Sequence, residues 1–585
     1  MNSIWLATIA LMSLYLGYRF YSKFIAEKIY QLDPEYTTPA HELEDGKDFV
    51  PTNKWVVFGH HFTSIAGAAP IVGPAIAIYW GWLPAIMWIV VGTIFAAGVH
   101  DFGTLLLSIR HKGRSIGTLA NELIGERARI LFLFIILILV LMVNAVFAWV
   151  ISNLFISFPA SVLSVFIQIP LAIWIGYYTY KRSGNILIPS LIALVVMYSA
   201  AVISSYVPLL QIDLISYFGG EQNTVLFGLN GVSMAFLSWI VILMIYVYIV
   251  SILPVWKLLQ PRDFINAQQL ILGLAILYLG LIFLSPDITA PISNPTADDV
   301  SWFPLLFITI ACGAVSGFHG LVASGTTSKQ INKETDARFV GYLGAIGEGA
   351  LAVITIIAVA TLFNTNDDFT STYSSFSAAG ATGLNSFIQG AGQLATGLMI
   401  PSEVARTIIA VIVVSFAATT LDTSVRLMRY IISELGEIYQ IKSLKRIHVA
   451  TSIAVLSSAA LVLLPKGPLG LGSGGYLLWP LFGTANQLLA GISLLLITVW
   501  LKRKGRSIIY TLVPMVFILV MTIWAMIQQV GFQWSGLGET DANLLLFCLG
   551  AIILGFTIWI LIEAARMLMD KEQFSKGNPE IKEKI

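Results

Sequence analysis

Long apolar runs alternate with short polar segments along almost the whole sequence. We count fifteen runs long enough to cross a bilayer, a distance that takes about 20 helical residues. The runs centre near Met12, Ala68, Val91, Leu141, Gln168, Val196, Leu243, Ile276, Cys312, Ala350, Val413, Leu456, Leu489, Leu519 and Leu554. The pattern therefore predicts an all-α polytopic membrane protein with about fifteen transmembrane helices.

The basic residues of the polar segments test this count independently. If the N-terminus lies outside, the odd-numbered loops are cytoplasmic and should hold the Lys and Arg residues. Those loops and the C-terminal tail hold 31 of the 33 Lys and Arg residues, and only Arg406 and Lys466 lie elsewhere. We therefore expect fifteen spans, with the N-terminus outside and the C-terminus cytoplasmic.

The second apolar run is interrupted in its middle. Residues 58–74 read FGHHFTSIAGAAPIVGP, which places Gly67 and Pro70 at membrane depth. Proline removes a backbone donor and glycine weakens a helix, so we expect the helix to break near residues 68–70. Broken backbone at this depth is tolerated only where it is buried in protein or lines a cavity. The segment is therefore a candidate for half of a substrate site.

A second interrupted run repeats this composition. Residues 312–327, CGAVSGFHGLVASGTT, hold four glycines, a histidine and several hydroxyl side chains. The interrupted runs are spans two and nine, and their odd offset makes them cross the membrane in opposite directions. That is expected of an inverted repeat, in which paired broken helices form the site near the midplane. Repeats of five spans (two to six, nine to thirteen) and of seven spans (two to eight, nine to fifteen) fit equally well.

We expect the two breaks to form a cradle for a carboxylate. A half-helix presents free N–H groups and the positive end of its dipole, and no Lys or Arg is expected deep in any span to take that role. The candidate substrate-binding residues are Thr63, Ser64, Gly67, Ala68, Ser316, Gly317, His319, Ser324, Asn486 and Gln487. The alternatives are that glycines such as Gly317 only allow close helix packing, and that Asn486 and Gln487 bond a neighbouring helix.

Ionisable residues inside the spans are candidates for carrying a coupling proton, because burying a charge in a membrane costs at least about 2.5 kcal/mol. The candidates are His60, His61, His319, Asp101 and Glu348. His60 and His61 are adjacent, so on a helix their side chains diverge by about 100°. They can hardly bind one metal ion together, and we expect no metal site.

Two opposite-charge pairs have a simpler interpretation. Asp422 precedes Arg426 by four residues, and Glu403 precedes Arg406 by three. Opposite charges at these spacings stabilise a helix end. We therefore expect both pairs to be structural.

Composition excludes several classes of protein. The chain has 585 residues, of which 57% are hydrophobic and 11% charged, whereas a soluble domain has about 25% charged residues. Its net charge of +1 gives no indication of nucleic-acid binding. Two cysteines in apolar segments make neither a disulfide framework nor a metal site. Among the loops, we expect residues 31–54 to wrap the cytoplasmic face and residues 363–400 to hold a short re-entrant or surface helix.

Six motifs identify a family resemblance. They are FGHHFTSIAGAAPIVGP (58–74), VHDF (99–102), LPVWKLLQPRDF (253–264), ITIACGAVSGFHGLVASGTTSKQ (308–330), LDTSVRLMRY (421–430) and LWPLFGTANQLLAG (478–491). On these motifs, which run from the second span to the thirteenth, the chain resembles the carbon starvation protein A (CstA) family of bacterial transporters.

The resemblance implies a solute importer of the bacterial cytoplasmic membrane that takes up short peptides or a small carboxylate such as pyruvate by proton symport. It also implies a fold related to the amino acid–polyamine–organocation (APC) superfamily, which is LeuT-like and has a five-plus-five inverted repeat. On this basis we expect an N-terminal membrane module at 1–370, with broken helices near 58–79 and 304–325. A C-terminal membrane module at 371–570 and a cytoplasmic tail at 571–585 would follow.

Function can be narrowed by what is missing from the sequence. The chain has no Walker A sequence for ATP, no H-E-x-x-H protease motif and no TVGYG-type channel filter. We therefore expect a transporter that works by alternating access, with no enzymatic activity and no cofactor. Its partners would be a small-molecule solute, a coupling ion (most simply H⁺) and the lipid bilayer. The alternative from another class is a membrane oxidoreductase with histidine-ligated haem.

Overall fold

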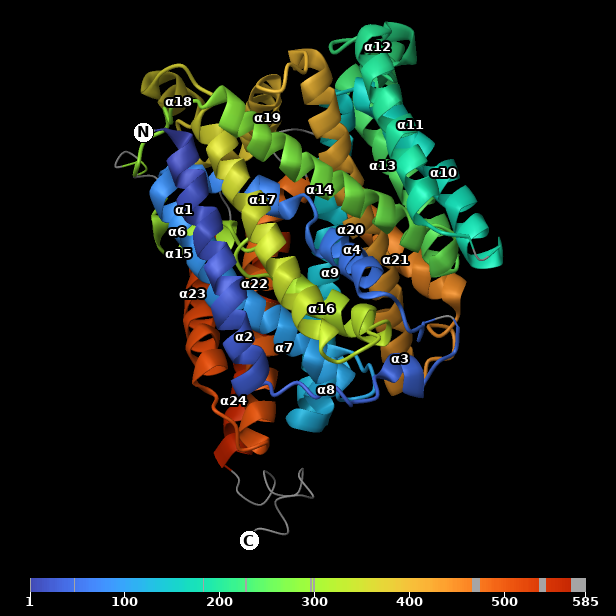
Figure 1. Cartoon of the computed structure of the whole chain (residues 1–585), viewed down its shortest axis with the longest axis vertical. Helices are drawn as coiled ribbons and strands as arrows, with labels where there is room; N and C mark the ends of the chain where they lie inside the picture. The colour runs from blue at the N-terminus through green and yellow to red at the C-terminus, as the bar shows by residue number, and fades with distance from the viewer. Residues whose placement is uncertain are drawn as a thin grey trace.

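The computed structural model forms one helical bundle (Figure 1). It describes residues 2–46, 48–182, 184–226, 229–294, 297, 300–465, 474–535 and 543–569. Lys466 and the predicted tail at 571–585 lie outside these residues. In Figure 1 the N-terminal helix begins at the upper end of the bundle and the last helix ends at the lower end.

Helices lie at all fifteen predicted positions. In chain order they are α1 (Ser3–Leu16) with α2 (Ser22–Phe24), α4 (Lys54–Ile65) with α5 (Ala69–Ala77), α6 (Trp82–Gly92) with α7 (Gly98–Ile109), α9 (Glu126–Ser157), α10 (Ala160–Arg182), α11 (Leu187–Tyr206), α13 (Gly231–Ile252), α14 (Leu259–Leu284), α15 (Trp302–Thr309) with α16 (Gly317–Gly325), α17 (Leu343–Ala360), α20 (Ser402–Ile438), α21 (Ile447–Leu463), α22 (Gly474–Arg503), α23 (Ile509–Ser535) and α24 (Leu544–Met569).

The remaining elements lie in the loops. They are α3 (Pro39–Glu42), α8 (Ile116–Leu123), α12 (Leu214–Tyr217), α18 (Asn366–Thr372), α19 (Phe376–Thr396) and the antiparallel strands β1 (Thr224–Leu226) and β2 (Leu229–Asn230). Helix α19 occupies the predicted 363–400 loop. It is no surface helix, because it packs against α5, α14, α17 and α20.

The length and composition of the helices support a multi-pass membrane protein. Among the described residues, twelve helices are long and apolar enough to cross a membrane, and the bent pair α4–α5 makes a thirteenth candidate. Helix α21 is a shorter apolar helix, and the ninth predicted span is divided into the short helices α15 and α16. The all-α polytopic fold with two broken helices is confirmed.

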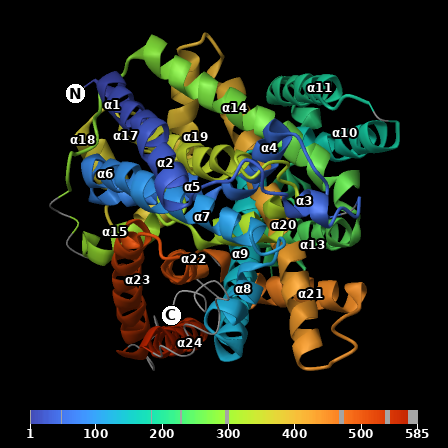
Figure 2. The same ribbon diagram turned by 60° about the horizontal axis from the view of Figure 1, so that its bottom comes forward.

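Two long helices, α9 and α20, form the centre of the bundle. In Figure 2 they lie between α10 and α11 at one edge and α23 and α24 at the opposite edge. The neighbours of α9 (the fourth span) include α20, α21, α22 and α24, and those of α20 (the eleventh) include α9, α10, α11 and α14. Moving each span by seven positions exchanges these two groups, although α9 also packs against α13, and α20 also packs against α13, α19 and α21. An inverted repeat with an offset of seven spans produces this exchange.

This exchange of neighbours does not hold for the seventh and fourteenth spans. Helix α13 (the seventh span) packs against α9, α20 and α21, whereas α23 (the fourteenth) packs against α15, α22 and α24. Their neighbours are not related by a shift of seven. A shift of seven spans thus relates part of the packing of α14 (the eighth span) to that of α24 (the fifteenth) but does not relate α13 to α23.

The segment before α4 links the two broken helices. The backbone N–H groups of Val50 and Thr52 donate to the carbonyls of Lys329 and Gln330, just after α16, at 3.2 and 3.1 Å. The Thr38 hydroxyl donates to the carbonyl of Ile331 at 2.7 Å. The segment thus lies along the end of the bundle that carries α8 (Figure 1) and ties the start of α4 to the end of α16.

Candidate functional site

The break in span two separates α4 from α5 by three residues. The Asn53 side chain caps α4 by accepting from the Trp55 N–H at 2.9 Å, and α4 ends at Ile65. Helix α5 begins at Ala69, with Pro70 in its first turn, where a missing N–H costs least. The two helices are bent by 45°. The predicted break near residues 68–70 is confirmed to within two residues.

Two hydroxyl groups without partners lie beside this break. The Oγ of Ser64 and the Oγ1 of Thr420, on α20, are buried and have no hydrogen-bond partner among the described residues. A side chain on Gly67 would meet that Thr420 hydroxyl and would come within about 3.0 Å of the Phe147 ring. The predicted site residue Thr63 differs, because its hydroxyl donates to the Gly59 carbonyl at 2.9 Å.

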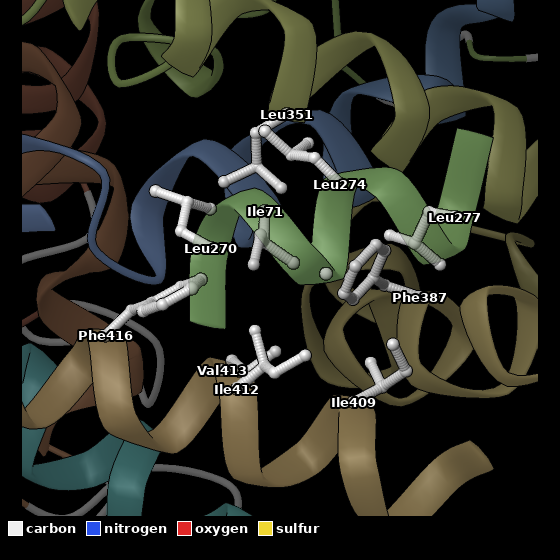
Figure 3. Close-up of a pocket in the computed structure, with 11 residues that line it drawn as sticks. Ile71, Leu270, Leu274, Leu277, Leu351, Phe387, Ile409, Ile412, Val413 and Phe416 are labelled. Atoms are coloured by element: carbon white, nitrogen blue, oxygen red, sulfur yellow. The ribbon is translucent and has the colours of Figure 1, made fainter. Parts of the chain in front are cut away.

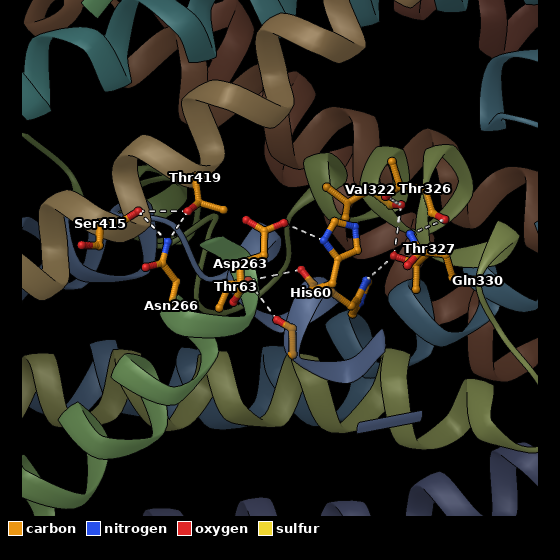
Figure 4. A network of polar contacts seen from close by, with 12 residues as sticks. His60, Thr63, Asp263, Asn266, Val322, Thr326, Thr327, Gln330, Ser415 and Thr419 are labelled. Atoms are coloured by element: carbon orange, nitrogen blue, oxygen red, sulfur yellow. Dashed lines mark hydrogen bonds and ion pairs between the residues drawn. The ribbon is translucent and has the colours of Figure 1, made fainter. Parts of the chain in front are cut away.

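The two neighbouring histidines of α4 have partners on different helices. His60 Nδ1 lies 2.7 Å from Asp263 Oδ2 on α14, and His61 Nδ1 lies 3.0 Å from the Thr327 hydroxyl beyond α16. Figure 4 shows His60, Asp263 and Thr327 in this network. The divergence expected from helix geometry is confirmed. Among the described residues, no group of three or more His, Cys, Asp and Glu side chains is arranged to hold a metal ion.

The break in span nine is longer, and α22 fills it. Helix α15 ends at Thr309 and α16 begins at Gly317. The Asn486 Oδ1 accepts from the Phe318 N–H at 2.9 Å, so a side chain of α22 caps α16. Its Nδ2 lies 3.0 Å from both Ser316 Oγ and Cys312 Sγ. Of the two alternatives for Asn486, the structure has the bond to a neighbouring helix.

Three more predicted residues also contact protein rather than open space. Gln487 donates to the Phe307 carbonyl at 3.3 Å. Ser324 donates to the Gly320 carbonyl at 2.7 Å and accepts from the Ile116 N–H at 3.1 Å. Gly317 packs against the backbone of α22, where an added side chain would clash. These contacts support the close-packing alternative for Gly317.

Four of the buried ionisable residues form one chain across three helices. Asp101 on α7 joins two histidines, because its Oδ1 lies 2.7 Å from His100 Nδ1 and its Oδ2 lies 2.8 Å from His319 Nδ1 on α16. His319 Nε2 in turn lies 3.2 Å from Glu348 Oε2 on α17, an ion-pair distance without hydrogen-bond alignment. All four side chains are at most 2% exposed.

Such a chain can hold and move a proton. An imidazole between two carboxylates can accept a proton on one ring nitrogen and release one from the other, and it titrates near neutral pH in water. The sequence identified Asp101, His319 and Glu348 separately. It could not show that they touch, because they come from three different spans.

The predicted structural pair Asp422–Arg426 is wrong. Asp422 Oδ2 instead forms an ion pair with Arg262 of α14 and accepts from the Tyr246 hydroxyl at 2.9 Å. Arg426 donates to the Val250 and Leu253 carbonyls at 2.7 and 2.9 Å. A neighbouring helix that offers a partner overrides the i,i+4 spacing on α20. The other predicted pair is confirmed, with Glu403 and Arg406 3.2 Å apart.

A buried arginine near the start of a span is not predicted by the sequence. Arg262 is only 2% exposed, and its Nε donates to Gln168 Oε1 at 3.3 Å. Sequence reasoning missed both Arg262 and its neighbour Asp263, although they stand in the motif LPVWKLLQPRDF. Their place near the start of an apolar run resembles that of ordinary charges at a helix end.

A narrow apolar cavity lies towards the other end of α14. It is lined by Ile71, Leu270, Gly273, Leu274, Leu277, Leu351, Phe387, Ile409, Ile412, Val413 and Phe416, and Figure 3 shows these side chains from α5, α14, α17, α19 and α20. Its volume of about 10 Å³ gives room for roughly one water molecule. We therefore do not assign the solute to it.

Comparison with known proteins gives consistent results over most of the chain. The family model described as "Carbon starvation protein CstA" matches residues 2–370 and 364–525. The chain is 34% identical to a "Peptide transporter CstA" of Campylobacter jejuni, covering 90% of this chain and 80% of that protein. It is 31% identical to the "Pyruvate/proton symporter BtsT" of Escherichia coli, covering 90% and 81%.

Among solved structures, the chain is similar to an Eremococcus coleocola manganese transporter, with a TM-score of 0.48, 12% identity, and coverage of 90% of this chain and 99% of that one. It is also similar to MhsT in complex with L-phenylalanine, with a TM-score of 0.47, 12% identity, and coverage of 88% and 99%.

Proposed function

The chain belongs to the carbon starvation protein CstA family, and we propose that it is a secondary active transporter that imports a small carboxylate, such as pyruvate, or a short peptide together with protons. Movements of spans two and nine would open a site at the α4–α5 break to one side of the membrane and then to the other. The names of two relatives, a peptide transporter and a pyruvate/proton symporter, support this solute class. The comparisons give no support to the haem-binding alternative.

The observation that carries proton coupling is the chain His100–Asp101–His319–Glu348. Burying two carboxylates and two imidazoles in a membrane protein costs free energy, so such residues usually have a function. The chain joins α16, the second half of a broken helix, to α7 and α17. A change in its protonation would therefore act directly on the contacts between one half of a broken helix and its two neighbours.

His319→Gln tests this coupling, because the glutamine side chain still forms hydrogen bonds but neither gains nor loses a proton near neutral pH. We expect the variant to lose accumulation driven by a pH gradient and to keep exchange at equal pH. Both are measured side by side in proteoliposomes with labelled pyruvate and labelled dialanine. Asp101→Asn, Glu348→Gln, His60→Gln and His61→Gln complete the set. If all five variants accumulate solute like the wild type, protons are not carried at these residues.

We also propose the orientation with the N-terminus outside and the C-terminus cytoplasmic, in the cytoplasmic membrane. A cysteine at Ser115 or Lys504 should then react only from the cytoplasm, and one at Gly220 only from outside. The exposed Cys548 is replaced by serine first, whereas Cys312 is buried. Labelling of all three positions from the same side would contradict the orientation. We further propose that residues 1–370 form an N-terminal membrane module and residues 371–570 a C-terminal one.

A further inference from the structure

A polar stripe runs between α14 and α20. On α14, Arg262, Asn266 and Gln269 follow one another at helical spacing and face the same side. Asn266 donates to Thr419 Oγ1 at 2.5 Å and to the Ser415 carbonyl at 3.3 Å, both on α20. Figure 4 shows Asn266 between these two residues. The stripe therefore faces the helix that also contacts the α4–α5 break.

One end of this stripe is a buried ion pair. Arg262 is 2% exposed and Asp422 1%, and Tyr246 of α13 donates to the same Asp422 oxygen that Arg262 binds. A buried pair of this kind is weak evidence for stability, because each ion loses several kcal/mol of hydration. A role in binding or coupling accounts better for its presence in a membrane-spanning bundle.

Several polar atoms at and near this ion pair lack hydrogen-bond partners among the described residues. The second carboxylate oxygen of Asp422, the Oδ1 of Asp263 and both amide atoms of Gln269 are buried, with no partner in the part of the chain that the structure describes. The two carboxylate oxygens can each take a proton, and the Gln269 NH₂ can donate to a further acceptor. Asp263 Oδ2 also lies 2.7 Å from His60 Nδ1 on α4, the half-helix before the break. The ion pair is thus joined, through Asp263 next to Arg262, to the half-helix that leads into the proposed solute site.

We propose that Arg262 binds the carboxylate of the solute and that Asp422 takes the place of that carboxylate while the site is empty. Guanidinium groups bind carboxylates in a two-point geometry and keep their charge at all physiological pH values. A pyruvate and the C-terminus of a peptide both carry this group, so one residue would serve both solutes. The inference rests on the proposed function and names the residue that recognises the solute class.

The replacement of the Asp422 carboxylate by the solute carboxylate also couples solute binding to proton binding. When the solute takes Arg262, Asp422 loses its counter-ion within a buried interface and binds a proton from water, which it returns when the solute leaves. The charged and titratable groups around it are Arg262 and Asp263 of α14, Tyr246 of α13, Arg426 of its own helix and, through Asp263, His60 of α4. The bound state then keeps the same net charge as the empty one, with one proton bound for each carboxylate.

The test is exchange at equal pH in proteoliposomes, with labelled pyruvate and labelled dialanine as probes. In the wild type, ionised Asp422 competes with the solute, so the KM should rise with pH, by up to about tenfold per unit. Asp422→Asn cannot compete or bind the proton, so its KM should stay at the low-pH value of the wild type between pH 6 and 8. Arg262→Gln should raise the KM of both probes by about 30-fold or more.

Because Arg262→Gln leaves Asp422 unpaired and can fail to fold, the double variant Arg262→Gln/Asp422→Asn removes both charges. It should insert normally and still show the raised KM. The matched control is the pair Arg129–Glu434, which also joins α20 to a neighbouring helix, at 2.6 Å; Arg129→Gln/Glu434→Gln should stay within twofold of the wild type.

A wild-type KM in the double variant, or a wild-type pH dependence of KM in Asp422→Asn, would overturn the inference. A wild-type protein that exchanges neither probe would instead contradict the proposed function. His319→Gln separates the two sites further, because it should lose accumulation but keep the pH dependence of the exchange KM.

Discussion

The two broken helices have similar sequences but differ in what their half-helices contact. At span two, three residues separate α4 from α5, and the hydroxyls of Ser64 and Thr420 beside the break lack partners in the described structure. At span nine, seven residues separate α15 from α16, and Asn486 caps the new helix. One break therefore keeps unused polar groups, and the other is already filled by the protein.

This difference indicates a division of labour. A half-helix whose first turn lies beside free hydroxyls can bind a polar group of the solute, such as a carbonyl oxygen. A half-helix fixed by a side chain of α22 can instead hold His319 steadily between Asp101 and Glu348. The first break then serves binding and the second serves coupling, so variants at the two breaks should fail in different ways.

The largest effect is expected at the binding break. Gly67→Leu should abolish both uptake and exchange, because the side chain would fill the space in front of Thr420 and Phe147. The control is Gly555→Leu in α24, where an added side chain meets nothing within 4 Å, and it should transport normally. Membrane insertion of both variants is compared by fluorescence-detected size exclusion. Wild-type exchange by Gly67→Leu would show that this break does not hold the solute.

The next effect concerns the coupling break. Glu348→Gln should abolish accumulation under a pH gradient, because the row of ionisable side chains from His100 to Glu348 loses the carboxylate that faces His319 Nε2. Its exchange KM should stay within about twofold of the wild type, since no part of the solute is placed there. Accumulation and exchange of labelled pyruvate are measured on the same vesicles. A large rise in KM with intact accumulation would reverse the two assignments.

The sequence contained enough information to place the helices and the breaks. Length, hydropathy and the loop positions of Lys and Arg predicted the fifteen positions, and Gly67 and Pro70 predicted the first break, because these signals are local. Contacts between spans could not be predicted. Asp422 binds Arg262, which is 160 residues away in the chain, rather than Arg426 one turn along. Thr420 gave no signal either, because a Thr inside an apolar helix usually bonds its own backbone.

A moderate effect is expected from the two free hydroxyls. Ser64→Ala and Thr420→Val should each raise the exchange KM by up to about tenfold, the upper range for the loss of one hydrogen bond. Neither should lower the melting temperature, because these hydroxyls have no partner in the described part of the protein to lose. Thr63→Val is the matched control, since that hydroxyl bonds the backbone of α4. An unchanged KM in both variants would remove these hydroxyls from the solute site.

The smallest effect is expected at the cap of α16. Asn486→Ala removes the acceptor of the Phe318 N–H and should lower the free energy of unfolding by about 1 kcal/mol, as the loss of a helix cap does. The melting temperature should fall by a few degrees, while the KM should stay unchanged. Gln487→Ala, next to it on the same helix, is the control for general weakening of α22, because its amide bonds the Phe307 carbonyl outside α16.

This last variant is the sharpest test of the comparison, because a solute-binding asparagine would give the opposite result. If the solute carboxylate replaced Asn486 at the α16 terminus, or if Asn486 bound the solute directly, then alanine would change the KM by more than its change in stability explains. A KM shift of tenfold with an unchanged melting temperature would place solute at both breaks. An unchanged KM with lower stability would leave span nine to position the proton chain.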